Sequence, residues 1–353
     1  MSSNWKTTTA LPRTTRALVI RQSPPERKPR FHDAVVEEQP IPAPKSGEVV
    51  LWIRKGMYPR IAFGSTFGAD GAGMIVAAAD AKDALLGERV FLTPMRGWEK
   101  SPHGPESTFG ILGSSSFPAL GTFSEYVVVD RNEVLKTPPH LTDEEAAACP
   151  LAGLTAWRAV SLAQVSSNST VLISGIGGGV ALFALQFCIA LGASVYVTSS
   201  SDAKIARAVE LGARGGVKYT SKTWGKDLAA LLPNGVALDC VIDGGGSEIL
   251  KTTSPFLKQG GRVVCYGMTG TPANISLTMR EVMRNQAVIG TTMGSRADMV
   301  AATNFIAERK IVPVVAKILP GLDAAEQGFT MMQNGSEFGK IVVKIGQRDG
   351  AKL

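Results

Sequence analysis

A glycine-rich turn between two apolar segments constrains this chain more than any other feature. The uncharged segment 171–174 is followed by Gly175, Gly177, Gly178, Gly179, Val180 and Ala181. A tight turn from a strand into a helix needs backbone angles that glycine adopts most easily. The free N–H groups at a helix N-terminus attract phosphate. The pattern therefore predicts a strand, a turn that binds the pyrophosphate of a dinucleotide, and a helix.

The segments that follow the turn support this interpretation. The spelling departs from strict Gly-x-Gly-x-x-Gly, because Val180 stands where a third glycine would follow Gly175. A single glycine turn can also be an ordinary connection. However, we expect strands at 195–198, 217–219, 238–242 and 262–266, alternating with helices at 180–191, 203–211, 227–232 and 249–257. Such alternation predicts a parallel sheet with helices on both faces.

The second expected strand bears on the choice of dinucleotide. An acid near this position holds the ribose hydroxyls of NAD, whereas this chain has Ser200, Ser201 and then Lys204. Hydroxyls and a lysine suit the 2′-phosphate of NADPH, so NADPH is favoured over NADH. Asp202 leaves NADH open, although we expect its carboxylate to cap a helix starting at residue 203.

Composition excludes several classes of protein. No charged residue occurs from Ala159 to Ser201, but a buried strand with its covering helix explains that run better than a membrane span. The formal net charge is +7, and residues 1–30 carry seven bases and one acid, so the rest is nearly neutral. We expect neither membrane nor nucleic acid as a partner. RNA binding by the basic N-terminal segment is a minor alternative that predicts a steep dependence on salt.

Cysteine usage and the N-terminus bear on location. The four cysteines are widely spaced and form no Cys-x-x-Cys pair, as expected for buried thiols in a reducing compartment. The N-terminus lacks an apolar signal core, which favours the cytoplasm. Its Ser, Thr and Arg content weakly resembles a mitochondrial presequence, so mitochondria are a second possibility.

Outside the region of alternating strands and helices, the sequence predicts a different pattern of secondary structure. Residues 1–135 read as β-rich, with short apolar runs such as 17–20, 89–92 and 126–129. Segment 96–121 is rich in Gly, Ser and Pro and is expected to form a long surface loop or a lid. Thr142 and Glu145 form a capping-box pattern ahead of a helix. We expect a helix at 299–307 and a last strand at 340–345.

Short motifs spread over nearly the whole chain resemble one family. In order they are Gly68-Ala69-Asp70-Gly71-Ala72-Gly73, Gly87-Glu88-Arg89-Val90, Gly121-Thr122-Phe123-Ser124-Glu125-Tyr126, Leu154-Thr155-Ala156-Trp157, the glycine turn, Gly260-Gly261-Arg262-Val263 and Gly339-Lys340-Ile341-Val342. The set resembles the medium-chain dehydrogenase/reductase superfamily, in its zinc-free, quinone oxidoreductase-like branch. The resemblance implies a Rossmann-type doubly wound parallel sheet inserted into a GroES-like β-rich domain. Expected limits are 14–136 and 296–353 for the GroES-like domain and 137–295 for the dinucleotide domain.

The resemblance also implies site residues. Tyr58 would face the substrate and donate a proton, and Thr155 would touch the nicotinamide ribose. Lys204 and Tyr219 would lie by the adenosine phosphate. The nicotinamide end would be lined by Gly267, Met268, Thr269, Met293 and Gly294. The resemblance further implies a small-molecule substrate and a homodimer.

The positions where the family's alcohol dehydrogenases hold zinc are altered here. Asp70 follows Ala69 in place of a Gly-His-Glu motif, Leu151 stands at a cysteine position, and Cys149 is two residues away. Too few nitrogen and sulfur ligands remain, so we expect no metal. A zinc alcohol dehydrogenase is the alternative. Without a Lewis acid, we expect hydride transfer to a quinone, enone or other activated substrate conjugated with a carbonyl group.

One departure from the family pattern affects the catalytic interpretation. Gly47-Glu48-Val49-Val50 joins directly to Leu51-Trp52-Ile53-Arg54-Lys55-Gly56, where the family has a further strand and an Asn-x-x-Asp turn. A catalytically silent dinucleotide-binding protein is therefore the alternative to a reductase.

Overall fold

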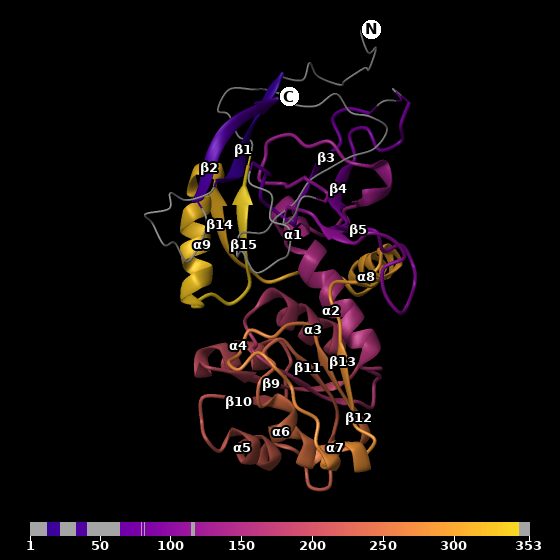
Figure 1. The fold of residues 1–353 in the computed structure, drawn as a ribbon, viewed down its shortest axis with the longest axis vertical. Coiled ribbons are helices and arrows are strands. Elements are labelled where there is room, and N and C mark those ends of the chain that lie inside the picture. The colour runs from indigo at the N-terminus through magenta and orange to yellow at the C-terminus, as the bar shows by residue number, and fades with distance from the viewer. Residues whose placement is uncertain are drawn as a thin grey trace. The chain divides into compact units, whose positions relative to one another are not determined.

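The computed structural model describes residues 13–21, 33–40, 64–78, 80, 82–113 and 117–345, which fall into two compact units (Figure 1). The first comprises residues 1–151, 295–336 and 341–353, and the second comprises residues 152–294 and 337–340. The domain limits expected from the sequence stay a prediction.

The second unit is built on a six-stranded sheet in the order β10-β9-β8-β11-β12-β13. All of its described pairings are parallel. The strands are β8 (Thr170–Ile173), β9 (Ser194–Ser199), β10 (Gly215–Lys218), β11 (Leu238–Asp243), β12 (Leu257–Cys265) and β13 (Ala287–Gly290). The helices are α2 (Pro150–Leu162), which begins in the first unit, α3 (Gly179–Ala190), α4 (Asp202–Glu210), α5 (Trp224–Leu231), α6 (Ile249–Thr253) and α7 (Met279–Met283). The expected Rossmann-type sheet is confirmed.

Burial explains the long uncharged stretch of the sequence. Strand β8 is buried along its whole length, and seven residues of α3 are also buried. A central parallel strand has helices on both faces and therefore has no polar side. Among the described residues, no helix is long and apolar enough to cross a membrane.

Some elements differ from the sequence prediction. The sixth strand, β13, was not expected, although β8 and β10 also have only four residues each. The helix expected at 249–257 ends at Thr253, followed by a 3₁₀ turn at Ser254–Phe256 and then by β12. Pro255 lies in that turn, and proline cannot donate the backbone hydrogen bond that continues a helix.

The first unit contains several small sheets and, among the described residues, three helices besides the start of α2. The strand pairs are β1 (Thr14–Arg21) with β2 (Asp33–Pro40), β5 (Met95–Arg96) with β6 (Gly110–Ile111), and β14 (Val315–Pro320) with β15 (Lys340–Lys344). Strands β3 (Ala72–Met74), β4 (Arg89–Leu92) and β7 (Val134–Lys136) form a three-stranded sheet. The helices are α1 (Asp143–Ala148), α8 (Arg296–Arg309) and α9 (Ala325–Asn334), with 3₁₀ turns at Arg131–Glu133 and Leu322–Ala324.

The core of this unit joins the two ends of the chain. Leu18 and Ile20 of β1 pack in one cluster with Phe67 and with residues just before and within α9, Leu322 and Ala325. As expected, residues from the N-terminal and C-terminal parts of the chain pack together in this β-rich unit. The strand expected at 126–129 is wrong: within this segment only Val129 forms an isolated bridge, and the nearby strand is β7.

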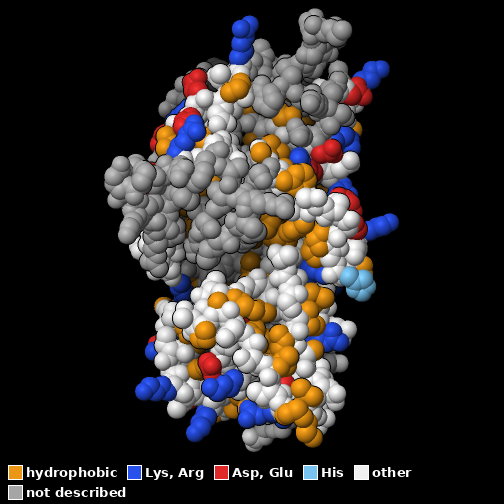
Figure 2. Space-filling model, in the orientation of Figure 1, with side chains coloured by type: hydrophobic (Ala, Val, Ile, Leu, Met, Phe, Trp, Pro, Cys, Tyr) orange, Lys and Arg blue, Asp and Glu red, His pale blue; other side chains and the backbone are white. Residues whose placement is uncertain are grey.

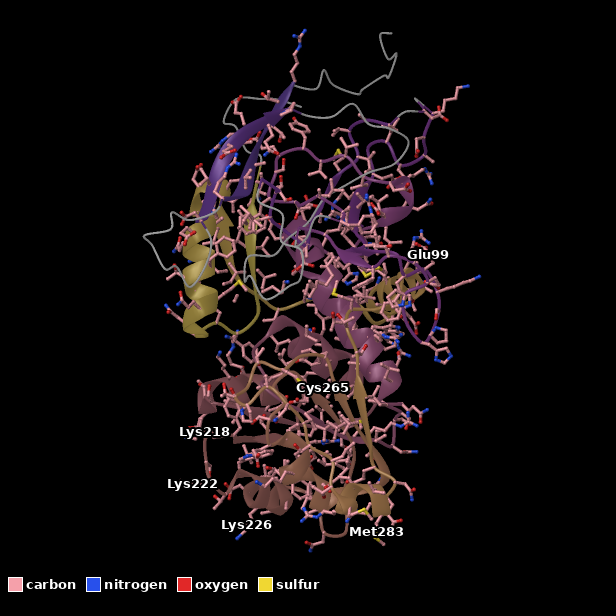
Figure 3. All side chains as sticks on the ribbon, in the orientation of Figure 1. Glu99, Lys218, Lys222, Lys226, Cys265 and Met283 are labelled. Carbon is pink, nitrogen blue, oxygen red and sulfur yellow. The ribbon has the colours of Figure 1, made fainter. Side chains whose placement is uncertain are left out.

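A carboxylate organises the Gly- and Ser-rich loop of this unit. Glu106 accepts hydrogen bonds from the backbone N–H groups of Glu99 (2.7 Å), Lys100 (2.9 Å) and Ser101 (2.5 Å). These bonds lower the pKa of Glu106 to about 2. Trp98 beside them is buried and donates from Nε1 to the Ser101 carbonyl at 2.7 Å. The segment is therefore folded on itself around the carboxylate; Figure 3 labels Glu99 at this loop.

We predict that Glu106→Gln loosens this loop, because an amide has one acceptor oxygen where the carboxylate has two. The measurement is amide hydrogen exchange at residues 99–101, which we expect to become severalfold faster at pH 7. Since the folded pKa lies below the unfolded one, the carboxylate's contribution is complete above about pH 4.5 and is lost as the pH falls toward about 2. Glu99→Gln is the control, and equal exchange in all three proteins would contradict the prediction.

Candidate dinucleotide site

The glycine turn closes β8 onto the start of α3. Gly175 and Gly177 adopt positive φ angles of 64° and 124°, which other residues rarely adopt. The turn is fixed from β9, since Thr198 accepts from the Gly175 N–H at its Oγ1 (3.2 Å) and from the Ile176 N–H at its carbonyl (2.8 Å). Gly178 is the exposed N-cap of α3 and, as a glycine, has no side chain with which to cap the helix. The N-terminus of α3 is thus shaped to receive an anion.

Lys204 lies against this turn. A Cβ placed on Gly177 would be 3.0 Å from Lys204 Cδ and 3.4 Å from its Nζ, so the lysine stem packs over the glycine backbone. Burial lowers the pKa of Lys204, while the charge of Glu337 acts in the opposite direction. The structure therefore brings together the glycine turn and the lysine that the sequence suggested for a phosphate.

A segment from near the C-terminus also meets the turn, which the sequence did not predict. The Gly339 N–H donates to the Gly177 carbonyl at 2.9 Å. A Cβ on Gly179 would be 2.7 Å from Lys340 Cδ, so a second lysine stem lies against the turn. Arg207 of α4 stacks over the Phe338 ring at 4.3 Å. The contacts of Gly339 and Lys340 with the turn join positions more than 150 residues apart, so no local pattern could predict them. The Gly339-Lys340 motif was the only sign of them in the sequence.

The remaining residues of the adenosine end lie where β9 and β10 finish. Ser199 ends β9, Ser200 is exposed, and Ser201 is the N-cap of α4. The expectation that Asp202 caps this helix is wrong: Asp202 is its first residue and pairs with Lys218 at 2.7 Å. Tyr219 directly follows β10 and is 47% exposed.

The residues expected at the nicotinamide end form a second group within this unit. Thr155 of α2 is buried and donates from Oγ1 to the Met293 sulfur at 3.6 Å. Met293 follows β13 at a positive φ of 49° and is followed by Gly294. Gly267, Met268 and Thr269 follow β12, and Thr269 donates from Oγ1 to the Gly244 carbonyl at 3.1 Å. The carboxyl ends of β12 and β13 thus carry these residues, at the edge where open parallel sheets bind ligands.

Two features that matter for catalysis lie outside the described residues. One is Tyr58, the expected proton donor. The other is the junction after Val50, on which the catalytically silent alternative depends.

Two of the positions that correspond to the family's zinc ligands, Asp70 and Leu151, are in contact, but their donors do not suit zinc. Asp70 Oδ1 accepts from the Leu151 N–H at 2.7 Å, so the carboxylate caps the first turn of α2. The buried Cys149 thiol donates to the Glu145 carbonyl at 3.3 Å. Within the described part of the chain, no three His, Cys, Asp or Glu side chains are grouped as a metal site requires. These residues do not fit a zinc ion.

We predict that Asp70→Ala lowers the free energy of unfolding by about 1–2 kcal/mol, because the Leu151 N–H loses its acceptor at a helix N-terminus. Asp70→Asn keeps an acceptor oxygen and is expected to lose less than half as much. Urea denaturation of the two variants and the parent measures the difference. Equal stability of Asp70→Ala and the parent would show that the bond contributes nothing.

Comparison with known proteins agrees with this architecture. Residues 48–139 match the alcohol dehydrogenase GroES-like domain, and residues 179–308 match the zinc-binding dehydrogenase domain. The chain is 40% identical over 333 residues to the zinc-type alcohol dehydrogenase-like protein YogA of Leptosphaeria maculans, covering 86% of this chain and 92% of that one. The chain belongs to the medium-chain dehydrogenase/reductase superfamily. Its place in the quinone oxidoreductase-like branch is confirmed, and it is an oxidoreductase by family.

Two other relatives are less similar to this chain. Acryloyl-coenzyme A reductase of Metallosphaera sedula is 26% identical over 327 residues, covering 87% of this chain and 95% of that one. The crystal structure of an NAD-dependent alcohol dehydrogenase superposes with a TM-score of 0.79 at 30% identity, covering 94% of this chain and all of the other. The fold class expected from the sequence is confirmed.

Proposed function

We propose that this protein is an NADPH-dependent reductase of quinones, enones or other substrates with a double bond conjugated to a carbonyl group, acting without zinc. The observation that carries the proposal is the uncapped N-terminus of α3 with the Lys204 stem packed on Gly177. It supplies free N–H groups for a pyrophosphate and a cation for one further phosphate.

The residues of this unit fit a phosphorylated dinucleotide. Lys204, with Ser200 and Ser201 beside it, suits a 2′-phosphate, while Asp202 is paired with Lys218 and so is less suited to hold ribose hydroxyls. A solved structure in the family is named as NAD-dependent, and another, 20% identical, is named as a complex with NADP. The names therefore divide, and the choice of NADPH rests on the residues of this chain.

The substrate class follows from the chemistry that the site lacks. With no donors suited to zinc, nothing described here would lower the pKa of an alcohol, whereas a conjugated double bond is already polarised. When bound, NADPH supplies a hydride to the electrophilic carbon. For an enone the β-carbon gains that hydride and the α-carbon gains a proton from a hydroxyl group, for which Tyr58 is our candidate, or from water. The relative named acryloyl-coenzyme A reductase supports including α,β-unsaturated thioesters.

The test is a titration with NADPH and NADH followed by steady-state turnover. The substrate panel is 1,2-naphthoquinone, a simple enone, acryloyl-coenzyme A and, as the unactivated control, ethanol with NADP⁺. We expect tighter binding of NADPH than of NADH, and turnover confined to the activated substrates. Binding without turnover of any substrate would instead support the silent dinucleotide-binding protein. Zinc in elemental analysis, together with ethanol oxidation, would overturn the zinc-free mechanism.

We also propose that the protein is a homodimer formed at the β13 edge of the sheet. Strand β13 pairs with β12 on one side, and its other edge has no strand partner among the described residues. The four hydrophobic side chains on and before α7 are 56–75% exposed: Leu277, Met279, Val282 and Met283. Figure 2 shows hydrophobic surface at the end of this unit where Figure 3 labels Met283. A second copy would cover both features.

We predict that Met279→Lys with Met283→Lys weakens this dimer at least tenfold, because two charges would be buried in an apolar contact. Sedimentation velocity over a range of concentrations measures it. Val236→Lys, at an exposed apolar position of the same unit, is the control. A parent that sediments as a monomer at all concentrations would overturn the proposal.

A further inference from the structure

A buried carboxylate joins three strand ends at the edge of the sheet that carries the glycine turn. Asp243, the last residue of β11, is 1% exposed. Its Oδ1 accepts from the Ser174 hydroxyl, which directly follows β8, and its Oδ2 accepts from the Gly246 N–H at 2.6 Å. The Cys265 thiol at the end of β12 lies 3.7 Å from the same Oδ2 and 2.9 Å from the Gly267 carbonyl (Figure 3).

The Asp243 carboxylate lies where the order of the strands in the sheet reverses. Successive strands run outward from β8 to β10 on one side and from β11 to β13 on the other, so the order reverses between β8 and β11. Ligands of open parallel sheets bind in the crevice at such a reversal. The Ser174–Asp243 hydrogen bond spans that pair of strands.

The bonds continue into the loops that carry the expected nicotinamide contacts. The Gly244 N–H donates to Ser174 Oγ at 3.2 Å. The loop after β11 in turn holds the loop after β12, because the N–H groups of Thr269 (3.2 Å) and Gly270 (2.8 Å) donate to the Gly244 and Gly245 carbonyls. A chain of hydrogen bonds therefore runs from the residue before the glycine turn to residues 267–270.

The charge state of the neighbouring thiol is consistent with this arrangement. Burial and the nearby Asp243 carboxylate raise the pKa of Cys265 to about 11. The thiol therefore keeps its hydrogen at neutral pH and can act as a donor beside the carboxylate and the Gly267 carbonyl. Buried carboxylates held by several donors keep their neighbours in one arrangement.

We propose that Asp243, through Ser174, is a positioning residue that sets the loops receiving the nicotinamide half of the dinucleotide. The inference rests on the proposed function. It predicts that loss of this network weakens contacts to the nicotinamide end while leaving the adenosine end, at Lys204 and the turn, unchanged.

The experiment compares two ligands and two matched serine variants. The ligands are NADPH and 2′,5′-ADP, which lacks the nicotinamide. Ser174→Ala removes the hydroxyl that follows β8, and Ser169→Ala removes an equally buried hydroxyl that precedes the same strand. Asp243→Asn serves as a second variant if Ser174→Ala fails to fold. We expect Ser174→Ala to raise the Kd of NADPH about tenfold, the effect of one good hydrogen bond, and to change that of 2′,5′-ADP less than about twofold.

The kcat and the KM for NADPH, measured during turnover, distinguish a positioning role of this network from a general loss of structure. With the best substrate of the panel, we expect kcat to fall by a larger factor than KM for NADPH rises in Ser174→Ala, and neither to change in Ser169→Ala. Equal weakening of both ligands, or no change in either, would overturn the inference while leaving the proposed function intact. A parent protein that binds neither ligand would overturn both.

Discussion

Replacing Gly178 by aspartate is expected to weaken NADPH binding at least 100-fold while leaving the protein as stable as the parent. Gly178 has extended backbone angles (φ −77°, ψ 150°), and a Cβ there would meet nothing within 4 Å. A side chain is therefore accommodated without strain. Aspartate is also a good N-cap, so α3 should gain a few tenths of a kcal/mol over glycine.

The loss of binding follows from charge at the site proposed for the pyrophosphate. An aspartate that caps α3 places a negative charge on the N–H groups that would hold the phosphates. Two like charges about 4 Å apart repel by about 4 kcal/mol at an effective dielectric constant of about 20. A 100-fold loss corresponds to about 2.7 kcal/mol, so this repulsion is sufficient.

Gly178→Asn shows how much of the loss in Gly178→Asp is due to the negative charge and how much to the added side chain. It has nearly the same size and also caps the helix, but it is neutral, so we expect a loss of only about tenfold. Fluorescence titration with NADPH at two salt concentrations measures both variants, and the gap between them should narrow at high salt. Gly178→Asp binding NADPH within threefold of the parent would show that the turn does not hold the pyrophosphate.

The sequence predicted correctly those features that depend on residues close together in the chain. The glycine turn and the Thr142–Glu145 capping box depend on residues a few positions apart, and both form as expected. Four of the six strands of the parallel sheet contain a short apolar run, at 171–173, 195–197, 240–242 and 263–265, so their positions could also be predicted from the sequence. Strand β13, which has the same length as β8 and β10, was not identified; three of its residues are half-buried and Gly290 is exposed.

The contacts that were missed join distant parts of the chain. Lys340 reaches the glycine turn only because the chain returns to this unit after residue 336. The Asp243 network links the ends of three strands, and no local pattern marks a buried carboxylate as their common acceptor. In the same way, the pairing of Asp202 with Lys218 across neighbouring strand ends overrode the local expectation of a helix cap.

Lys204→Ala is expected to weaken NADPH binding by about 10- to 100-fold and to change NADH binding less than twofold. The proposed role of Lys204 is an ion pair with the 2′-phosphate, which NADH lacks. A charge-assisted hydrogen bond to a phosphate contributes about 1.5–3 kcal/mol, which corresponds to this range. Lys222→Ala removes the same charge from the same unit at a position away from the turn (Figure 3) and is the matched control.

The pH dependence adds a test that depends on the burial of Lys204. Because burial lowers its pKa, the lysine in the free protein loses its proton at a lower pH than an exposed lysine would. NADPH affinity should therefore fall as the pH rises through that lowered pKa, whereas NADH affinity should not follow it. In Lys204→Ala this alkaline limb should disappear. If the variant keeps the parent's preference for NADPH and its alkaline limb, another cation near the turn, with Lys340 the first candidate, holds the 2′-phosphate instead.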